Sequence, residues 1–362
     1  MKEYYVLLVD KRENNSAATK AKKDVISICD IRGMEKFELL TDTSSGNSKI
    51  RKLKMGILAV FNWLRFIYRC DTNSILLFQH PFAGEELSTK FLIALKKYKK
   101  CRSVILIHDL ETLREGIGSE YIKSKKAARL DNEVLNSFDY IICHNEKMKQ
   151  YLIDKGFEES KLVCLGIFDY LTDNGMSDVE KGTPYTICIA GNLSKEKSAY
   201  IYKLIESIRE IKVNLYGTNY SDINFGNCEY HGSFDADELP SILKGDFGVV
   251  WDGAELEQCS GLSGEYLKYN NPHKVSLYLT SGKPVIVWKQ SAIYDFVKSH
   301  KVGIGIDSLF DLPEVLSNID RMQYAILRKN AIAVSEQLRD GYYLNKALDL
   351  VSMKSAENRA FE

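Results

Sequence analysis

Short apolar runs recur along the chain, and helical patterns lie between them. In the first half these runs lie at 4–10, 74–79, 103–109 and 140–145, and in the second half at 185–191, 212–217, 247–253 and 284–288. Strands that are apolar on both faces and separated by helices are typical of parallel sheets with helices on both sides. The sequence therefore predicts an α/β fold with doubly wound, Rossmann-like sheets.

A polar stretch over 169–184 interrupts this alternation; it contains glycines and ends in proline, a composition typical of a linker. We therefore expect an N-terminal domain over residues 1–172, a linker over 173–184 and a C-terminal domain over 185–338, facing each other across a central cleft. Residues 339–362 are predicted to form a helix and tail that could pack back on the N-terminal domain. The total of 362 residues fits this division into two domains.

The overall composition excludes several classes of protein. The net charge is zero, so no overall field would attract nucleic acid. The longest apolar stretch, 56–64, is far shorter than the about 20 residues that span a membrane. The N-terminal apolar run is too short for a signal peptide, and none of the eight cysteines forms a C-x-x-C pair. These features predict a cytoplasmic protein with reduced thiols.

Several catalytic and cofactor motifs do not occur in the sequence. The six histidines lie far apart, without H-x-x-x-H spacing or a nearby cysteine pair, so we expect no metal site. No G-x-S-x-G or G-x-x-x-x-G-K-[ST] occurs, which disfavours an elbow-type hydrolase and an NTPase. The first strand is not followed by G-x-G-x-x-G, which disfavours a nicotinamide cofactor.

Polar residues at strand ends are the candidate site residues of the N-terminal half, because ligands of open parallel sheets bind beyond the carboxyl ends of the strands. His108 and Asp109 end one predicted strand, where Asp109 or Glu111 could take a proton from an acceptor hydroxyl. The histidine–aspartate pair could equally be a structural hydrogen bond. Asn15 and Ser16 could cap the next helix or offer polar groups to the cleft.

In the C-terminal half, Lys274 lies behind Pro-His at the predicted start of a helix, where a lysine often holds a phosphate. A long glycine-rich loop over 251–274 leads to it. The strand-end Tyr216 could stack on a base or merely pack. Lys283 belongs at the opposite end of its strand, so its alanine variant should behave like wild type. The candidates in this half are Gly191, Asn192, Lys195, Tyr216, Gly217, Asp252, Gly253, Asn271, His273 and Lys274.

The blocks HDLETLR, DYIICHNEKM, FDY, HGSFDADELP, FGVVWDG and GEYLKYNNPHKVSLYLTSGKPVIVW lie within residues 75–305. They resemble blocks of a bacterial glycosyltransferase family that includes galactofuranosyltransferases of polysaccharide synthesis and the second glucosyltransferase of serine-rich adhesin O-glycosylation. The resemblance implies a GT-B fold, a UDP-sugar donor, a metal-independent mechanism and frequent homo-oligomerisation. It also implies that Lys274 binds the donor diphosphate, that Tyr216 lies by the nucleotide, and that Asn15 and Ser16 face the donor from the other domain.

We therefore expect a hexosyltransferase that uses UDP-galactofuranose or UDP-glucose and a glycan or glycosylated protein as acceptor. Without a metal, lysines and helix N-termini must stabilise the leaving diphosphate. A UDP-sugar epimerase of the same architecture and a non-catalytic, transferase-like partner protein stay open. A basic run over 51–69, with Trp63 and Phe66, could lie on the inner face of a membrane. It could equally be a core helix or a contact in a dimer or tetramer.

Overall fold

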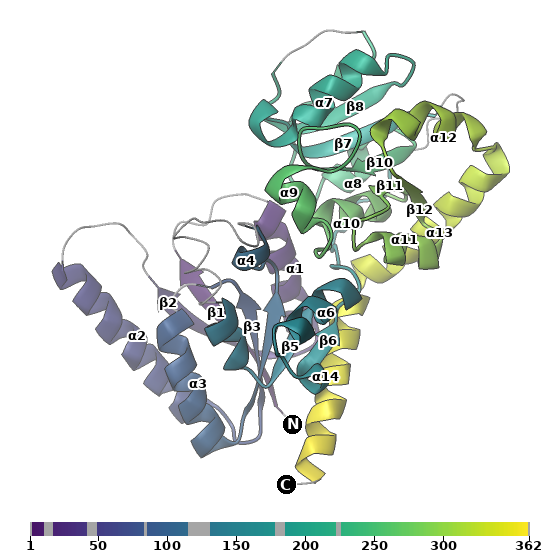
Figure 1. Ribbon diagram of the computed structural model, residues 1–362. Helices are drawn as coiled ribbons and strands as arrows, with labels where there is room; N and C mark the ends of the chain where they lie inside the picture. The colour runs from purple at the N-terminus through teal and green to yellow at the C-terminus, as the bar shows by residue number, and fades with distance from the viewer. Residues whose placement is uncertain are drawn as a thin grey trace. The chain divides into compact units, whose positions relative to one another are not determined.

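The computed structural model describes residues 2–10, 17–41, 49–82, 85–114, 131–177, 185–221 and 226–360 (Figure 1). The chain divides into two compact units. Unit 1 comprises Met1–His144, Lys149–Leu165 and Leu344–Glu362, and unit 2 comprises Asn145–Met148 and Gly166–Tyr343. Each unit contains one six-stranded sheet whose described strand pairs are all parallel, which confirms the predicted α/β class.

The sheet of unit 1 has the strand order β2-β1-β3-β4-β5-β6. Its strands are β1 (Glu3–Asp10), β2 (Glu35–Thr41), β3 (Ile75–His80), β4 (Arg102–Ile107), β5 (Tyr140–Cys143) and β6 (Leu162–Cys164). The helices of this part include α1 (Ala17–Ile31), α2 (Lys49–Arg69), α3 (Glu85–Lys99), α4 (Glu111–Arg114), α6 (Glu146–Asp154) and α14 (Tyr342–Ala360). The order reverses between β1 and β3, so the topological switch point of unit 1 lies at the carboxyl ends of these two strands.

The aromatic residues of α2 belong to the core of unit 1. The Trp63 ring stacks on Phe91 at 5.4 Å between centroids, and Phe66 stacks on Phe37 at 4.1 Å. Both Trp63 and Phe66 are buried, so the core reading of these two residues is correct and neither could lie on a membrane. The helix does have an exposed apolar side, formed by Ile57, Phe61, Leu64 and Tyr68. Among the helices in the described ranges, none combines the length and the apolar content that spanning a bilayer requires.

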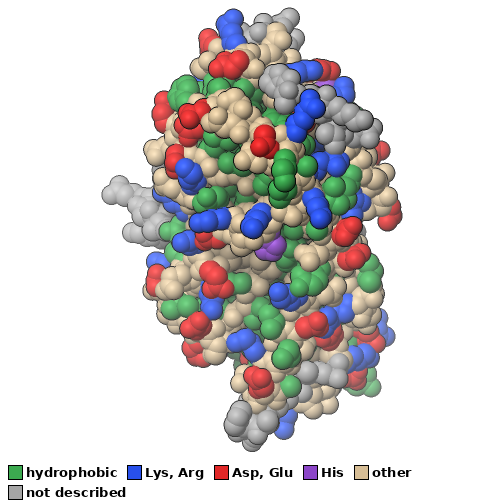
Figure 2. Space-filling view, turned by 90° about the vertical axis from the view of Figure 1, so that its right-hand side faces the viewer, with side chains coloured by type: hydrophobic (Ala, Val, Ile, Leu, Met, Phe, Trp, Pro, Cys, Tyr) green, Lys and Arg blue, Asp and Glu red, His purple; other side chains and the backbone are tan. Residues whose placement is uncertain are grey.

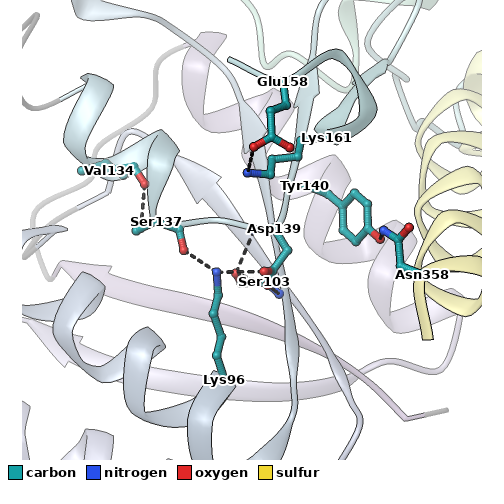
Figure 3. Close-up of polar contacts among 9 residues, drawn as sticks. All are labelled: Lys96, Ser103, Val134, Ser137, Asp139, Tyr140, Glu158, Lys161 and Asn358. Atoms are coloured by element: carbon teal, nitrogen blue, oxygen red, sulfur yellow. Dashed lines mark hydrogen bonds and ion pairs between the residues drawn. The ribbon is translucent and has the colours of Figure 1, made fainter. Parts of the chain in front are cut away.

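The C-terminal helix α14 packs on unit 1. Asp349 pairs with Arg32 at 2.8 Å, and Ser352 Oγ donates to the Glu3 carboxylate at 3.2 Å. Farther along the helix, Asn358 Nδ2 donates to the Tyr140 hydroxyl at 3.0 Å (Figure 3). The chain therefore returns to the N-terminal unit at its end.

The sheet of unit 2 has the strand order β12-β11-β10-β7-β8-β9. Its strands are β7 (Ile187–Asn192), β8 (Val213–Thr218), β9 (Cys228–Tyr230), β10 (Phe247–Val250), β11 (Val285–Trp288) and β12 (Gly303–Ile306). Its helices are α7 (Lys195–Ser207), α8 (Leu239–Ile242), α9 (Gly261–Tyr266), α10 (His273–Thr280), α11 (Tyr294–His300), α12 (Leu312–Asn318) and α13 (Arg321–Arg339). This is the Rossmann strand order, with its switch point between β7 and β10.

Helix α10 is fixed closely against the middle of this sheet. A Cβ atom on Gly248 of β10 would overlap the ring of Tyr278, so the helix approaches the strand through a glycine. The backbone amide of Ala190 in β7 donates to the Tyr278 hydroxyl at 2.7 Å. Tyr278 is buried, and burial raises its pKa well above the usual value. These contacts bring the first turn of α10 to the switch point of unit 2.

The exposed charges are mixed in sign. On the face in Figure 2, basic and acidic side chains alternate over the surface, without a large patch of one sign. This mixture fits the net charge of zero, and it leaves any attraction of an anionic ligand to a local site.

Candidate functional site

Lys274, Asp252 and Gly191 come together at the switch point of unit 2. Lys274 is the second residue of α10, and its Nζ lies 3.2 Å from Oδ1 of Asp252, which follows β10. A Cβ atom on Gly191, in β7, would come within 3.3 Å of the Lys274 Cε atom. We call these three residues the lysine site. All three are candidates that the sequence predicted.

The electrostatics of the lysine site favour an anion. The N-cap residue of α10, Pro272, gives the helix no side-chain cap. Uncapped amides at a helix N-terminus and the positive end of the helix dipole attract negative charge. The Lys274 side chain is 26% exposed and that of Asp252 is 17% exposed, so a ligand can reach both. Asp252 is then the group with which an anion would compete for the lysine.

Glycines at this edge are needed for close backbone packing. Gly217, in β8, has φ of +135°, and a Cβ atom there would overlap the carbonyl oxygen of Gly191. Gly253 has φ of +107°, and its Cβ atom would overlap the backbone of Ser260. Side chains are strained at such φ values, so both positions favour glycine. These glycines hold the strand ends of β7 and β8 and the loop after β10 in place.

Tyr216 packs in unit 2 in a way that leaves no ring face for a ligand. It is 1% exposed, and its ring stacks on His231 with centroids 4.7 Å apart. Its hydroxyl accepts from the amide of Lys244 at 2.8 Å. Of the alternatives that the sequence left open for Tyr216, packing is the one that these contacts favour.

Asn271 and His273 contact segments of unit 2 other than the lysine site. The Asn271 side chain accepts from Asn145 Nδ2 at 2.7 Å and donates to the Gly166 carbonyl at 2.9 Å. The His273 ring stacks on Tyr170 with centroids 5.0 Å apart. These contacts fix the start of α10, so both residues can affect Lys274 by holding its helix.

The remaining candidates of unit 2 are Asn192, the last residue of β7, and Lys195, the first residue of α7. Asn192 Oδ1 accepts from the amide of Ser194 at 3.0 Å and from Asn219 Nδ2 at 3.2 Å. The Lys195 ammonium lies 5.2 Å from the centre of the Tyr202 ring. Both residues stay candidates for contacts with a ligand at this edge.

Lys283 lies before the amino end of β11, as the sequence predicts. It is 3% exposed, and its Nζ donates to the Gly245 carbonyl at 2.5 Å. Removal of the side chain would leave this buried carbonyl without its partner. We therefore expect Lys283→Ala to lower the free energy of unfolding, and its effect on UDP binding and kcat stays a prediction.

In unit 1, the predicted acid–base candidates follow β4. Nε2 of His108 lies 2.7 Å from Oε1 of Gln79, in the neighbouring strand β3. The carboxylates of Asp109 and Glu111 each lie 3.7 Å from Nη1 of Arg114. Asp109 is 31% exposed and Glu111 is 35% exposed, so both can meet a ligand. Asn15 and Ser16 lie outside the described residues.

A buried pair that was not predicted from the sequence lies at the same edge of unit 1. His80 is the last residue of β3, and its Nε2 lies 3.1 Å from Oδ1 of Asp131. The other Asp131 oxygen accepts from the Thr112 amide at 2.8 Å and from the Thr112 hydroxyl at 2.6 Å. The signal for His80 was its place at a strand end, but the sequence gives no sign that Asp131 lies beside it.

Comparisons with known proteins agree with this two-unit description. Family models described as "Glucosyltransferase 3-like, N-terminal domain" and "Glucosyltransferase 3-like, C-terminal domain" match residues 3–167 and 187–351. The chain is 33% identical to the β-1,6-galactofuranosyltransferase WbbI of Escherichia coli (strain K12) over 293 residues, which cover 79% of this chain and 81% of that protein. It is 22% identical to glucosyltransferase 3 of Streptococcus gordonii, over 92% of this chain and 93% of that protein.

Among solved structures, the sucrose-phosphate synthase of Thermosynechococcus elongatus is similar, with a TM-score of 0.63. The match covers 99% of this chain and 100% of that chain at 10% identity, so the likeness is one of fold alone. It supports the predicted GT-B fold with two Rossmann-like domains.

Proposed function

The chain belongs to the glucosyltransferase 3-like family of glycosyltransferases, and from this premise we propose that it transfers a hexose from a UDP-sugar to a hydroxyl group of a glycan or glycosylated protein. The observation that carries the proposal is the lysine site at the switch point of unit 2. Ligands of Rossmann-type sheets bind outside the carboxyl ends of the strands at this point. A cation and an uncapped helix N-terminus there suit a diphosphate.

Positive charge is most important to the transfer when the bond between the sugar and the diphosphate breaks. The acceptor hydroxyl oxygen forms a bond to the anomeric carbon, while the bond from that carbon to the diphosphate oxygen breaks. The diphosphate leaves with the bonding electrons, and the acceptor proton passes to a base. Lys274 would stabilise the charge that grows on the leaving diphosphate. Asp109 or Glu111, at the carboxyl edge of the unit 1 sheet, would receive the proton.

Of the donors that the sequence left open, UDP-galactofuranose is favoured. The chain is 33% identical to a galactofuranosyltransferase and 22% identical to a glucosyltransferase. A thermal-shift screen with UDP, GDP and dTDP tests the nucleotide, because a ligand at about a hundred times its dissociation constant adds about 2.7 kcal/mol of stability. Release of UDP from UDP-galactofuranose and from UDP-glucose, with and without a glycan acceptor, then tests the sugar and the reaction.

The alternatives give different results in the same assay. An epimerase would convert one UDP-sugar into another without acceptor-dependent release of UDP. A non-catalytic partner protein would bind UDP without turning over either donor. Acceptor-dependent release of UDP is the result that our proposal requires.

We also propose that the reaction needs no metal ion. Lys274 and the first-turn amides of α10 supply positive charge where a metal would otherwise be used. Turnover should therefore persist when the protein is dialysed against EDTA and assayed in its presence. A loss that Mg²⁺ or Mn²⁺ restores would overturn this part of the proposal.

We propose that the protein is cytoplasmic and that the exposed side of α2 touches the inner face of the membrane. Ile57, Phe61, Leu64 and Tyr68 form that side, and the helix sequence contains lysines and arginines but no acidic residue. Such helices bind anionic lipid surfaces. Vesicles with anionic lipid should therefore pellet the protein, and neutral vesicles should not. If this side instead forms a dimer or tetramer contact, the protein will stay in the supernatant and light scattering will give the larger mass.

A further inference from the structure

Asp131 joins three parts of unit 1 through one buried carboxylate. The Asp131 side chain is 6% exposed, and Oδ1 lies 3.1 Å from Nε2 of His80 at the end of β3. Oδ2 accepts from the amide and the hydroxyl of Thr112, in α4. An ionised carboxylate only accepts hydrogen bonds, so Nε2 of His80 carries the proton in this contact. One side chain therefore sets the orientation of the His80 ring and the position of α4.

These groups lie where unit 1 would meet a ligand. His80 ends β3, one of the strands that flank the switch point of this sheet. Helix α4 follows β4 after the segment with His108 and Asp109, and Glu111 is its first residue. The backbone amide of His108 also donates to the carbonyl of His80 at 2.8 Å. Asp131 is thus linked through His80 and Thr112 to the segment that holds His108, Asp109 and Glu111.

We infer that Asp131 is a positioning residue for the acceptor side of the reaction, which rests on the proposed function. It holds α4 and the end of β3 so that the carboxylate of Asp109 or Glu111 meets the acceptor hydroxyl in the correct place. Burial of a carboxylate costs free energy unless it is well hydrogen-bonded, and the donors from His80 and Thr112 meet that need. A displacement of about 1 Å at reacting groups can cost about a hundredfold in rate.

Unit 1 contains a matched control in Asp139, whose contacts with Ser103 and Lys96 are drawn in Figure 3. Asp139, just before β5, accepts from the amide of Ser103 at 2.7 Å and from its hydroxyl at 2.9 Å. Its other oxygen pairs with the Lys96 ammonium at 3.0 Å. Asp139 therefore has the same kinds of donor as Asp131, namely a backbone amide, a hydroxyl and a nitrogen of a basic side chain. It lies at the amino ends of β4 and β5, away from the ligand-binding edge.

The experiment compares Asp131→Asn with Asp139→Asn in the full-length protein. Each variant replaces an oxygen acceptor by an amide that donates, so both should lower the melting temperature. We expect Asp131→Asn to lower kcat about tenfold or more, with the dissociation constant for UDP within about twofold of wild type, because the lysine site lies in the other unit. Asp139→Asn should keep the kcat of wild type. The kcat values are compared at a temperature where each variant is fully folded.

Milder variants keep the test decisive if Asp131→Asn does not fold. Thr112→Val removes the hydroxyl donor and keeps the backbone amide, and His80→Gln keeps a side-chain N–H for Asp131. We expect Thr112→Val to lower kcat without an effect on UDP binding, and His80→Gln to retain more activity than His80→Ala.

Wild-type kcat in both Asp131→Asn and Thr112→Val would overturn the inference, and so would an equal loss in Asp131→Asn and Asp139→Asn. In either case wild-type transfer would still support the proposed function. A wild-type protein that neither binds UDP nor transfers a hexose would overturn both.

Discussion

The ammonium nitrogen of Lys274 lies 3.2 Å from a carboxylate oxygen of Asp252, where β7 and β10 end beside the first turn of α10. The pair has no net charge, although it lies where the fold favours an anionic ligand. A diphosphate that binds there must share or take over the lysine from Asp252. The two side chains should therefore have opposite effects on binding when each is removed.

Lys274→Ala should weaken UDP binding about tenfold or more, because a hydrogen bond to a charged group is worth about 1.5–3 kcal/mol. It should also lower kcat, since the charge that develops on the leaving diphosphate loses its partner. Lys274→Arg should bind UDP more tightly than Lys274→Ala but less tightly than wild type, because a planar guanidinium does not replace a compact ammonium in a tight site. Calorimetry with UDP and initial rates at saturating donor measure both effects.

A suitable control for Lys274 is Lys212→Ala. Lys212 precedes β8 at the amino edge of the same sheet, is 54% exposed, and lies 4.0 Å from Glu229. Its loss should leave UDP binding and kcat unchanged. Equal losses in both variants would mean that Lys274 acts through general charge and not through contact with the donor.

Asp252→Asn should strengthen UDP binding about fivefold. Two unit charges about 4 Å apart interact by about 1 kcal/mol in water, so removal of the carboxylate should relieve repulsion of this order and release Lys274 to the diphosphate. Calorimetry at two salt concentrations measures the change, and the gain should shrink at the higher one. Weaker binding in the variant would show that Asp252 positions the lysine or contacts the donor itself.

Asp109→Asn should lower kcat while UDP affinity stays nearly unchanged. Loss of a general base typically costs about a hundredfold or more. Arg114 lies equally far, 3.7 Å, from the carboxylates of Asp109 and Glu111, so the structure keeps both as candidates. Glu111→Gln is the parallel variant, and wild-type turnover in Asp109→Asn together with a loss in Glu111→Gln would assign the base to Glu111.

The parts of the fold that depend on local pattern could be predicted from the sequence. The apolar runs identified the central strands of both sheets, and Pro-His-Lys before an apolar segment identified the start of α10. The place of Lys274 in the first turn of a helix beside a strand end could be predicted, because a strand end, a glycine-rich loop and a helix start all occur within a short stretch of chain. The order of the strands, which fixes the switch points, could not be read from the pattern.

Contacts between distant residues were the part that the sequence could not supply. Tyr216 ends an apolar run, and only the packing of His231 against its ring shows that it is a core residue. His80 and Asp131 are separated by 51 positions, and their contact depends on how the chain returns after α4. The place of Lys283 before the amino end of a strand could be predicted from the sequence, but its hydrogen bond to the Gly245 carbonyl could not.

Gly217→Ala should destabilise unit 2 and weaken UDP binding. The added Cβ atom would overlap the carbonyl oxygen of Gly191, a residue of the lysine site. The control is Gly226→Ala, since Gly226 also has a positive φ, +79°, but nothing lies within 4 Å of its added Cβ atom. The control should show only the backbone strain, about 1 kcal/mol. Melting temperatures and UDP titrations of both variants test this, and similar losses would mean that strain alone matters at Gly217.

His144 should make the stability of the protein depend on pH. It lies after β5, fully buried, with Nε2 3.0 Å from the carbonyl oxygen of Ile107. Burial disfavours the charged ring and lowers the pKa of His144 from 6.5 to about 4. Between these values the unfolded chain takes up a proton that the folded chain does not, so the free energy of unfolding falls as the pH falls from 6.5 to about 4.

The shift in the His144 pKa lowers the free energy of unfolding by about 3 kcal/mol in total, since each pKa unit corresponds to about 1.4 kcal/mol. This loss is complete only at a pH below the pKa of His144 in the folded protein. His144→Gln keeps a side-chain N–H but cannot titrate, so it should remove this part of the pH dependence. Urea unfolding of wild type and variant at several pH values between 7 and 4.5 gives the difference in their free energies of unfolding. The carboxylates contribute equally to the two proteins, so their effect cancels in this difference. The wild type should lose stability faster than the variant as the pH falls. Parallel curves would show that His144 takes up its proton in the folded protein as readily as in the unfolded chain.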